Sequence, residues 1–147
     1  MSRNVRFAVA VHILVMLALE SEPRTSAVIA DSVHTNPVVI RRILGLLRRA
    51  GLVDGRMGAG GGFRLARPAR AIRLDEVFRA VEADGAAPPA HRPNPRCPVA
   101  GRVTRVLDDV GRHAERAFLA TLAGRSLADV TRQVRDGGRE NRTGARS

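Results

Sequence analysis

The sequence predicts a mostly α-helical fold with a small β-hairpin, followed by one long helix that stands apart from the compact region. Three observations favour this class. Residues 25–50 contain two short helical segments separated by a tight turn. Residues 58–62 form a glycine-rich run between two short segments of strand-forming residues. Residues 99–123 carry apolar side chains at three- and four-residue steps, which is typical of an amphipathic helix.

Length and charge limit the possible classes of protein. The chain has 147 residues, enough for one compact domain and an appended element. Its 25 basic residues, all arginine, outnumber 14 acidic residues and give a net charge of +11, which favours a polyanionic partner. The longest apolar run, residues 7–19, is too short to span a bilayer and lacks a signal-peptide cleavage site. We therefore expect a cytoplasmic protein without a membrane partner.

The first helix is expected to run from Ser2, which can cap it, to about Glu20. Apolar residues lie on nearly all its sides, so it should be buried, and His12 is interpreted as a hydrogen-bonded core residue. A second helix is expected to begin at Thr25 or Ser26. Its predicted core side chains are Val28, Ile29 and Val33.

The third helix has a well-marked start and end. The Asn36 side chain can accept hydrogen bonds from exposed backbone amides, and Pro37 suits the first helical position. Gly51 can adopt the left-handed conformation that ends many helices. Between them we expect an apolar inner face and a basic outer face. The predicted inner residues are Val39, Ile40, Ile43 and Leu47, and the outer residues are Val38, Arg41, Arg42, Gly45 and Arg48.

A hairpin and a further helix are expected next. Residues 52–54 and 63–65 are strand candidates around the glycine loop, whose residues can take positive φ where a turn requires it. Ile72 and Leu74 are predicted to add a third short strand. Residues 75–81 are predicted to form a helix, with inward side chains at Val77, Phe78 and Val81.

Helix, turn, basic helix and glycine-tipped hairpin together predict a winged helix-turn-helix within residues 1–83, a fold that inserts one helix into the major groove of double-stranded DNA. Arg41 and Arg42 are expected to contact base edges, because a guanidinium can bind guanine through two hydrogen bonds. A solvated helix face would explain the two arginines alone, but the flanking elements favour DNA. The other predicted DNA contacts, mainly to phosphate, are Ser26, Thr35, Asn36, Pro37, Val38, Arg56 and Arg64.

The glycine loop does not match nucleotide-binding motifs. A P-loop requires lysine, which the chain lacks, and a dinucleotide fingerprint counted from Gly58 and Gly60 would need glycine in place of Phe63. The histidines show no metal-ligand spacing, and no catalytic triad or carboxylate pair is indicated. An enzyme is therefore the least favoured class, and we expect no cofactor and no metal.

The C-terminal half is predicted to contain three further regions. Residues 84–98, with five prolines, should form a loop, and residues 99–136 a long helix followed by a short helix capped by Ser126 and Asp129. Residues 137–147 are expected to be disordered. The long helix needs a partner for its apolar stripe, and a second copy is favoured, which makes it a dimerisation helix. The stripe consists of Val103, Val106, Leu107, Val110, Ala114, Ala117, Phe118 and Leu122.

Several segments together resemble a known family. They are residues 26–30, 36–44, 50–53, 60–65, 72–77 and 97–99. Through them the chain resembles the Rrf2 family of bacterial winged-helix transcription regulators over roughly residues 1–135. The resemblance implies a homodimer with cross-packed long helices that binds an inverted-repeat operator, usually as a repressor.

Cysteine usage separates this chain from many members of that family. Many members hold an iron–sulfur cluster through three cysteines after the winged helix, whereas this chain has only Cys97, so a cluster is not expected. A cluster shared with His12 of the partner subunit is a weaker alternative. Arg96 beside Cys97 leaves a thiol redox sensor as a second hypothesis. A protein-interaction module acting through the long helix is the third, and the effector is unknown.

Overall fold

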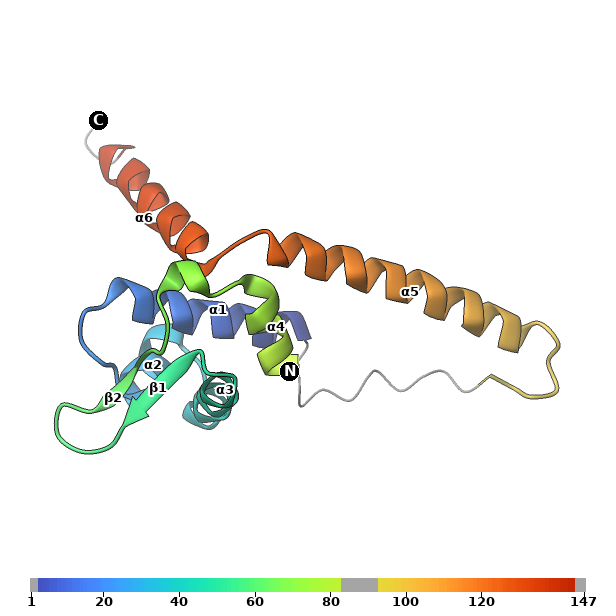
Figure 1. Cartoon of the computed structure of the whole chain (residues 1–147), viewed down its shortest axis with the longest axis horizontal. Helices are drawn as coiled ribbons and strands as arrows, with labels where there is room; N and C mark the ends of the chain where they lie inside the picture. Colours follow the sequence, from blue (N-terminus) through green and yellow to red (C-terminus); the bar gives the residue numbers. More distant parts are fainter. Residues whose placement is uncertain (1–2, 83–92, 145–147) are drawn as a thin grey trace.

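The computed structural model describes residues 3–82 and 93–144. In this part a compact body of helices and one hairpin carries a long helix that projects from it (Figure 1). The elements are α1 (Arg3–Leu19), α2 (Ser26–Val33), α3 (Pro37–Arg49), β1 (Val53–Arg56), β2 (Gly62–Leu65), the 3₁₀ turn η1 (Ala69–Ala71), α4 (Leu74–Glu82), α5 (Ala100–Ala123) and α6 (Leu127–Gly144). The predicted class, mostly helical with a small two-stranded wing, is confirmed. None of the described helices is both long and apolar enough to span a membrane.

Helix α1 is the centre of the body. It contacts α2, α3, α4, α6 and β2, and its residues Ala10, Ile13 and Leu14 are completely buried. The core that forms around it also includes Ile29, Ile40, Ile43, Leu47, Leu52, Ile72, Val77, Val81 and Leu127. Each helix therefore contributes apolar side chains spaced three and four residues apart. These side chains pack together around α1 and exclude water from the core.

Two predicted core positions are wrong. His12 is exposed rather than buried, because Val5, Ala8 and His12 lie on the side of α1 opposite Ala10 and Ile13. Val28 is 43% exposed, because the short α2 packs only one face, that of Ile29 and Ala30, against the body. A helix apolar on several sides can leave one of them to solvent, and only the tertiary packing decides which.

The hairpin has two strands, and the predicted third strand is wrong. Ile72 follows η1, and Leu74 begins α4. The free edge of β2 is instead occupied by Arg24, whose backbone N–H donates to the Phe63 carbonyl at 3.0 Å and whose carbonyl accepts from the Phe63 N–H at 2.7 Å. Since this edge is already paired, residues 72–74 bond to another segment, the turn before α6.

At Gly62, the first residue of β2, the hairpin lies in close contact with the backbone of Arg24. The φ of Gly62 is +138°, and a Cβ atom built on it would lie 2.7 Å from the carbonyl carbon and oxygen of Arg24. Gly60, at the tip of the hairpin, also has positive φ, +71°, but a Cβ there would meet nothing within 4 Å. The glycine-rich sequence thus serves two purposes, a turn at the tip and, at the first residue of β2, a close backbone contact with Arg24.

Helix α5 joins the body at its C-terminal end. The Phe118 ring packs edge-on against Phe78 of α4, with centroids 5.0 Å apart, and Phe78 packs edge-on against Phe7 of α1 at 5.6 Å. The remainder of α5 extends away from the body (Figure 1). The prediction of a long helix is confirmed. The predicted proline-rich loop falls mostly on residues 83–92, which lie outside the described residues.

Helix α6 differs from the prediction in length and in packing. It continues to Gly144, so the expected disorder is wrong for residues 137–144, while residues 145–147 lie outside the described part. Leu127 is completely buried in the core and Thr131 is buried beside it. Because these first turns dock against α1, they supply the nucleus from which the polar remainder can continue as helix.

The start of α6 is a capping box, as predicted. The Asp129 N–H donates to Ser126 Oγ at 3.2 Å, and Asp129 Oδ2 accepts from the Ser126 N–H at 2.9 Å. The Ser126 backbone hydrogen bond is the main cause that lowers the pKa of the Asp129 carboxyl below its ordinary value, followed by the Ser126 side chain.

The substitution Gly62→Ala is expected to destabilise the protein more than Gly60→Ala. Positive φ costs an alanine roughly 1–3 kcal/mol at either position, but at Gly62 the new Cβ would also press against Arg24. Denaturant titration of both variants should give the lower midpoint for Gly62→Ala. Equal midpoints would mean that the backbone shifts there without cost.

The substitution Asp129→Asn is expected to lower the melting temperature near neutral pH, and to matter less in acid. An aspartate with a lowered pKa stabilises the fold above its unfolded pKa, and this contribution disappears as pH falls through the folded pKa. The difference from wild type should therefore shrink below about pH 4. Thermal unfolding by circular dichroism measures it, with Asp136→Asn, an exposed carboxylate further along α6, as the control. A difference that does not depend on pH would contradict the capping role.

Candidate DNA-binding surface

Helices α2 and α3 form a helix-turn-helix. Thr25 caps α2 through its hydroxyl oxygen, which accepts a hydrogen bond from the Val28 N–H at 3.3 Å. The helix ends at His34, whose left-handed φ of 56° reverses the chain direction. The Thr35 N–H then donates to the Ala30 carbonyl at 3.1 Å, which closes the turn before α3. The predicted capped helix and tight turn are both present.

The start of α3 follows the predicted chemistry closely. Asn36 Oδ1 accepts a hydrogen bond from the Val38 N–H at 2.8 Å, and Pro37 is the first helical residue. Gly51, with φ of +72°, follows the end of the helix in the left-handed conformation. A capped helix N-terminus that faces solvent concentrates N–H groups and the positive end of the helix dipole, which together attract an anion.

A cleft of about 520 Å³ lies between the two helices. It brings together Ser26, Thr35, Pro37 and Arg41, four of the residues predicted to contact DNA, and it is also lined by Ala27, Ala30, Asp31 and His34. Asp31 was not among the predicted contacts. An exposed aspartate on a short helix carries no sequence signal of its own, and its place beside Arg41 depends on the angle of the turn.

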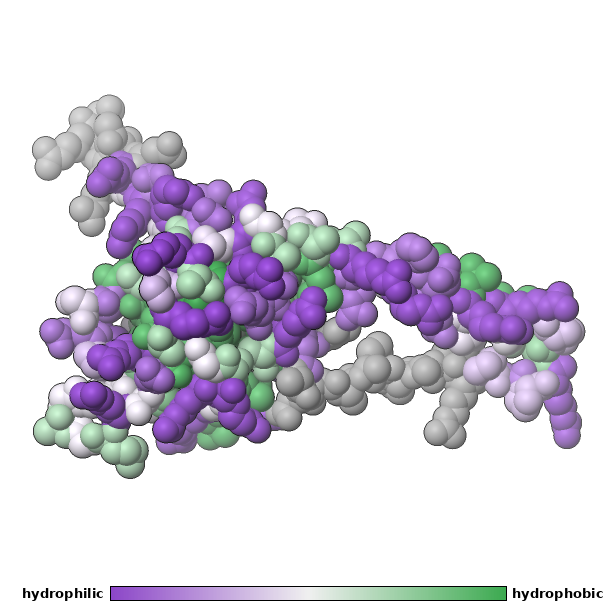
Figure 2. All heavy atoms as spheres, viewed as in Figure 1, coloured by the Kyte–Doolittle hydropathy of each residue, from purple (hydrophilic) through white to green (hydrophobic). Residues whose placement is uncertain are grey.

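The two faces of α3 differ completely in exposure. Ile40, Ile43, Leu44 and Leu47 are buried on the inner side. Val38 is 64% exposed on the outer side, and Arg41 and Arg42 are exposed there with it. The described part of the chain therefore leaves the predicted base-reading residues at the surface. Figure 2 shows hydrophilic residues interspersed with apolar ones over this side of the body.

The wing adds two further arginines. The register pairs Asp54 with Arg64 and Arg56 with Gly62, and both pairs lie on one face of the hairpin because they alternate with Gly55–Phe63. Arg56 and Arg64 are exposed on this face, while Phe63 packs against the core. Met57, at the tip, is completely exposed and was not predicted as a contact. The wing thus presents two cations, the Asp54 carboxylate opposite Arg64, and one apolar side chain to its surroundings.

The described residues do not fit an iron–sulfur cluster held by three cysteines. Within residues 3–82 and 93–144 no group of three or more His, Cys, Asp or Glu side chains could hold a metal ion. Cys97, the single cysteine of the sequence, is exposed in the turn before α5, where its N–H donates to the Asn94 carbonyl. A redox role for Cys97 stays a prediction.

Comparison with known proteins identifies the family. The Rrf2 family, described as iron-dependent transcriptional regulators, matches residues 3–133. YwnA of Bacillus subtilis, named as an HTH-type transcriptional regulator, is 42% identical over 128 residues, which cover 86% of this chain and 95% of the relative. A solved structure described as a DNA-binding protein is similar with a TM-score of 0.69 and 40% identity, over 85% of this chain and 97% of that one.

A second solved structure is similar over nearly the whole chain. It is described as a transcriptional regulator from Lactobacillus plantarum, with a TM-score of 0.77 and 25% identity over 96% of this chain and 97% of that one. The family match covers the helix-turn-helix, the wing, α5 and the start of α6 together. The chain belongs to the Rrf2 family, and it is a DNA-binding transcriptional regulator rather than an enzyme.

Proposed function

We propose that this protein binds a specific inverted-repeat operator as a homodimer and represses transcription by occupying promoter DNA. The observation that carries the proposal is the outer face of α3, where Arg41 and Arg42 are exposed opposite a fully buried apolar face. Such a helix can enter the major groove without disturbing the core. Repression then requires only that a bound dimer exclude polymerase from the promoter. Binding to chromosomal DNA also places the protein in the cytoplasm.

The proposed contacts divide into two classes. Arg41 and Arg42 read base edges, each bidentate pair with guanine contributing about 1–3 kcal/mol of discrimination. Asp31 lies in the same cleft as Arg41 and would accept a hydrogen bond from a cytosine amino group, whereas its charge repels phosphate. The remaining contacts position the protein on the sugar-phosphate backbone. The polar and charged members are Ser26, Thr35, Asn36, Arg56 and Arg64, while Pro37 and Val38 offer apolar contacts.

The homodimer is proposed from the surface of α5. Its apolar stripe faces solvent over most of its length, with Val106 and Leu107 each 62% exposed, while Arg105, Asp109 and Arg112 lie on the opposite side. An apolar stripe of this length on an isolated helix is unfavourable in water and is typical of an interaction surface. A second α5 packed against it would bury the stripe and join two winged helices into one DNA-binding unit.

The effector is not part of this proposal. The family description names iron, but the donor residues described above do not fit a three-cysteine cluster. The thiol sensor and the protein-interaction module therefore stay as alternatives. Each differs from the main proposal in what Cys97 or α5 does, and each leaves α3 as the DNA-binding helix.

The substitution Arg41→Ala is expected to change specificity, and Arg64→Ala is expected to change general affinity. Loss of a base contact should reduce the preference for one base pair by about 1–3 kcal/mol. Loss of a phosphate contact should weaken binding to all sequences and reduce the slope of log affinity against log salt by about 0.9. Fluorescence anisotropy with operator and scrambled duplexes across a salt series measures both effects.

The operator for this test comes from footprinting the wild-type protein on DNA upstream of its own gene. Arg135→Ala, an exposed arginine on α6, is the matched control because it removes the same charge from a helix that lies away from α3 and the wing (Figure 1). If Arg41→Ala and Arg64→Ala weakened specific and scrambled DNA equally, the division into base and phosphate contacts would be wrong.

The substitution Val106→Asp is expected to convert the dimer into monomers, because a charge in the centre of the apolar stripe cannot be buried without a partner. Sedimentation velocity should show the change, and cooperative binding to both half-sites should be lost. Arg105→Asp, one residue earlier and on the charged face, should remain dimeric. A wild-type protein that sediments as a monomer would instead favour the interaction-module hypothesis.

A further inference from the structure

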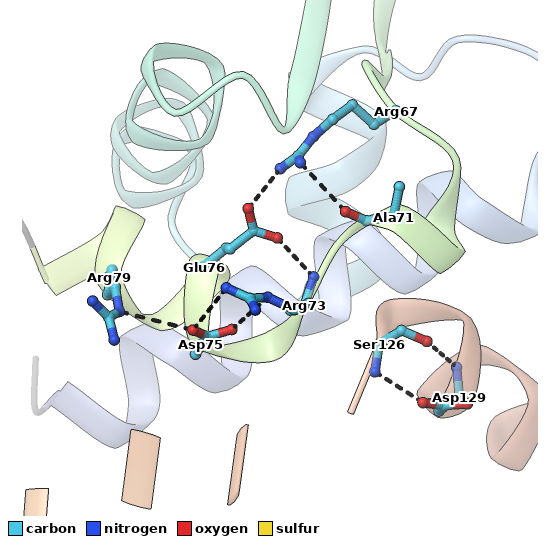
Figure 3. A network of polar contacts seen from close by, with 8 residues as sticks. All are labelled: Arg67, Ala71, Arg73, Asp75, Glu76, Arg79, Ser126 and Asp129. Carbon is cyan, nitrogen blue, oxygen red and sulfur yellow. Dashed lines mark hydrogen bonds and ion pairs between the residues drawn. The ribbon is translucent and has the colours of Figure 1, made fainter. Parts of the chain in front are cut away.

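Glu76, in the first turn of α4, lies between Arg67, which follows the wing, and the backbone of Arg73, which pairs with the turn between α5 and α6 (Figure 3). That turn, residues 124–126, is fixed to the segment before α4 through the backbone. The Leu74 N–H donates to the Arg125 carbonyl at 3.0 Å, and the Leu127 N–H donates to the Ile72 carbonyl at 2.8 Å. The direction in which α5 leaves the body is thereby tied to residues 72–74.

The wing is held to the same region by Arg67. This residue follows the end of β2, at Leu65, by two positions. Its Nη1 donates to the Ala71 carbonyl at 3.3 Å, and its Nη2 donates to Glu76 Oε1 at 3.3 Å. The Arg67 side chain therefore spans the 3₁₀ turn and reaches the first turn of α4. It links the end of β2 to α4 directly, in addition to the backbone that connects them.

The second oxygen of Glu76 completes the link. Glu76 Oε2 accepts a hydrogen bond from the Arg73 N–H at 2.9 Å, and Arg73 is the residue that pairs with Ser126 across the turn. This backbone hydrogen bond, with the charge of Arg67, lowers the pKa of the Glu76 carboxyl below its ordinary value.

Arg73 is itself held in place by several contacts. The Arg73 guanidinium pairs with Asp75, with 3.3 Å between Nε and Oδ1, and the Asp75 side chain is buried. Arg73 is thus fixed by its side chain, by its own N–H and by its pairing with Ser126. Through Arg67 and Glu76, the wing is therefore linked to a backbone position that other contacts already hold in place.

We propose that Glu76 is a positioning residue that couples the direction of α5 to the position of the wing, and so sets where Arg56 and Arg64 meet DNA relative to α3. The inference rests on the proposed function, since it requires that α5 join two copies and that the wing contact DNA. Its effect acts through the wing arginines and not through the base-reading residues of α3.

The experiment uses the full-length dimer on its footprinted operator. Hydroxyl-radical footprinting separates the wing contacts from those of α3, and anisotropy gives affinity for the variants Glu76→Gln, Glu76→Asp and Arg67→Gln. Glu76→Gln should weaken the protections made by the wing and reduce affinity roughly two- to fivefold, as expected for loss of one partly exposed ion pair. Protections from α3 and the sedimentation of the dimer should remain unchanged.

Epistasis distinguishes positioning from general stability. In an Arg64→Ala background, Glu76→Gln should cause a smaller further loss of affinity, because both changes act through the wing. Glu76→Asp, which keeps the charge, should recover part of the wing protection. Arg67→Gln should reproduce the footprint of Glu76→Gln, whereas Arg70→Gln, an exposed arginine in the same 3₁₀ turn, should leave it unchanged.

The outcomes separate this inference from the proposed function. If Glu76→Gln lowered only the melting temperature, or weakened affinity equally with and without Arg64, the coupling role would be overturned while operator binding stood. If Glu76→Gln failed to fold, Arg67→Gln would decide the matter from the other member of the same ion pair. A wild-type protein without a specific footprint would overturn both.

Discussion

The packing of the apolar face of α3 against α1, α2, α4 and β1 is the constraint on which the rest of the surface depends. Ile40, Ile43 and Leu47 are almost completely buried, and burial of each such side chain contributes about 1.5–3 kcal/mol. A rotation of α3 that covered Arg41 would expose these residues and leave a buried charge unpaired, which is far more costly. The apolar face therefore fixes the direction of the basic face, and the exposure of the arginines proposed to contact DNA is a consequence of the core.

The protein combines two exposed surfaces of opposite character. The outer face of α3 and the wing carry arginine, for which a polyanion is the natural partner, and α5 carries an apolar stripe, for which another apolar surface is the natural partner. The two surfaces lie on different elements of one body (Figure 1). If α5 joins two copies, as proposed, operator affinity depends on the geometry between these two surfaces.

That geometry depends on a small number of contacts near the end of α5. The edge-on contact of Phe118 with Phe78 fixes one side of the helix, and the hydrogen bonds of residues 72–74 fix the turn that follows it. The wing meets the same region through Arg67 and Glu76. A signal that altered α5, whatever its chemical source, would reach the wing through these contacts.

Much of this structure could be predicted from interactions between residues that are close in sequence. The caps at Asn36 and Ser126, the left-handed Gly51 and the two faces of α3 depend on residues within four positions of one another, so the sequence alone predicts them. The exposure predicted for Arg41, Arg42, Arg56 and Arg64 follows from the same local periodicity. Whether these side chains touch DNA is still a proposal.

Tertiary structure decided the features that depend on distant residues. The free edge of β2 is paired by the backbone of Arg24 rather than by residues 72–74. His12 and Val28 are exposed, and α6 docks its first turns on the core and continues as helix. Asp31 enters the cleft, and Glu76 links the wing to the α5–α6 turn, only because the fold brings separate segments together. The periodicity of a sequence shows which faces of an element are apolar. Which of those faces is buried depends on how all the elements pack together, because the core has room for only some of them.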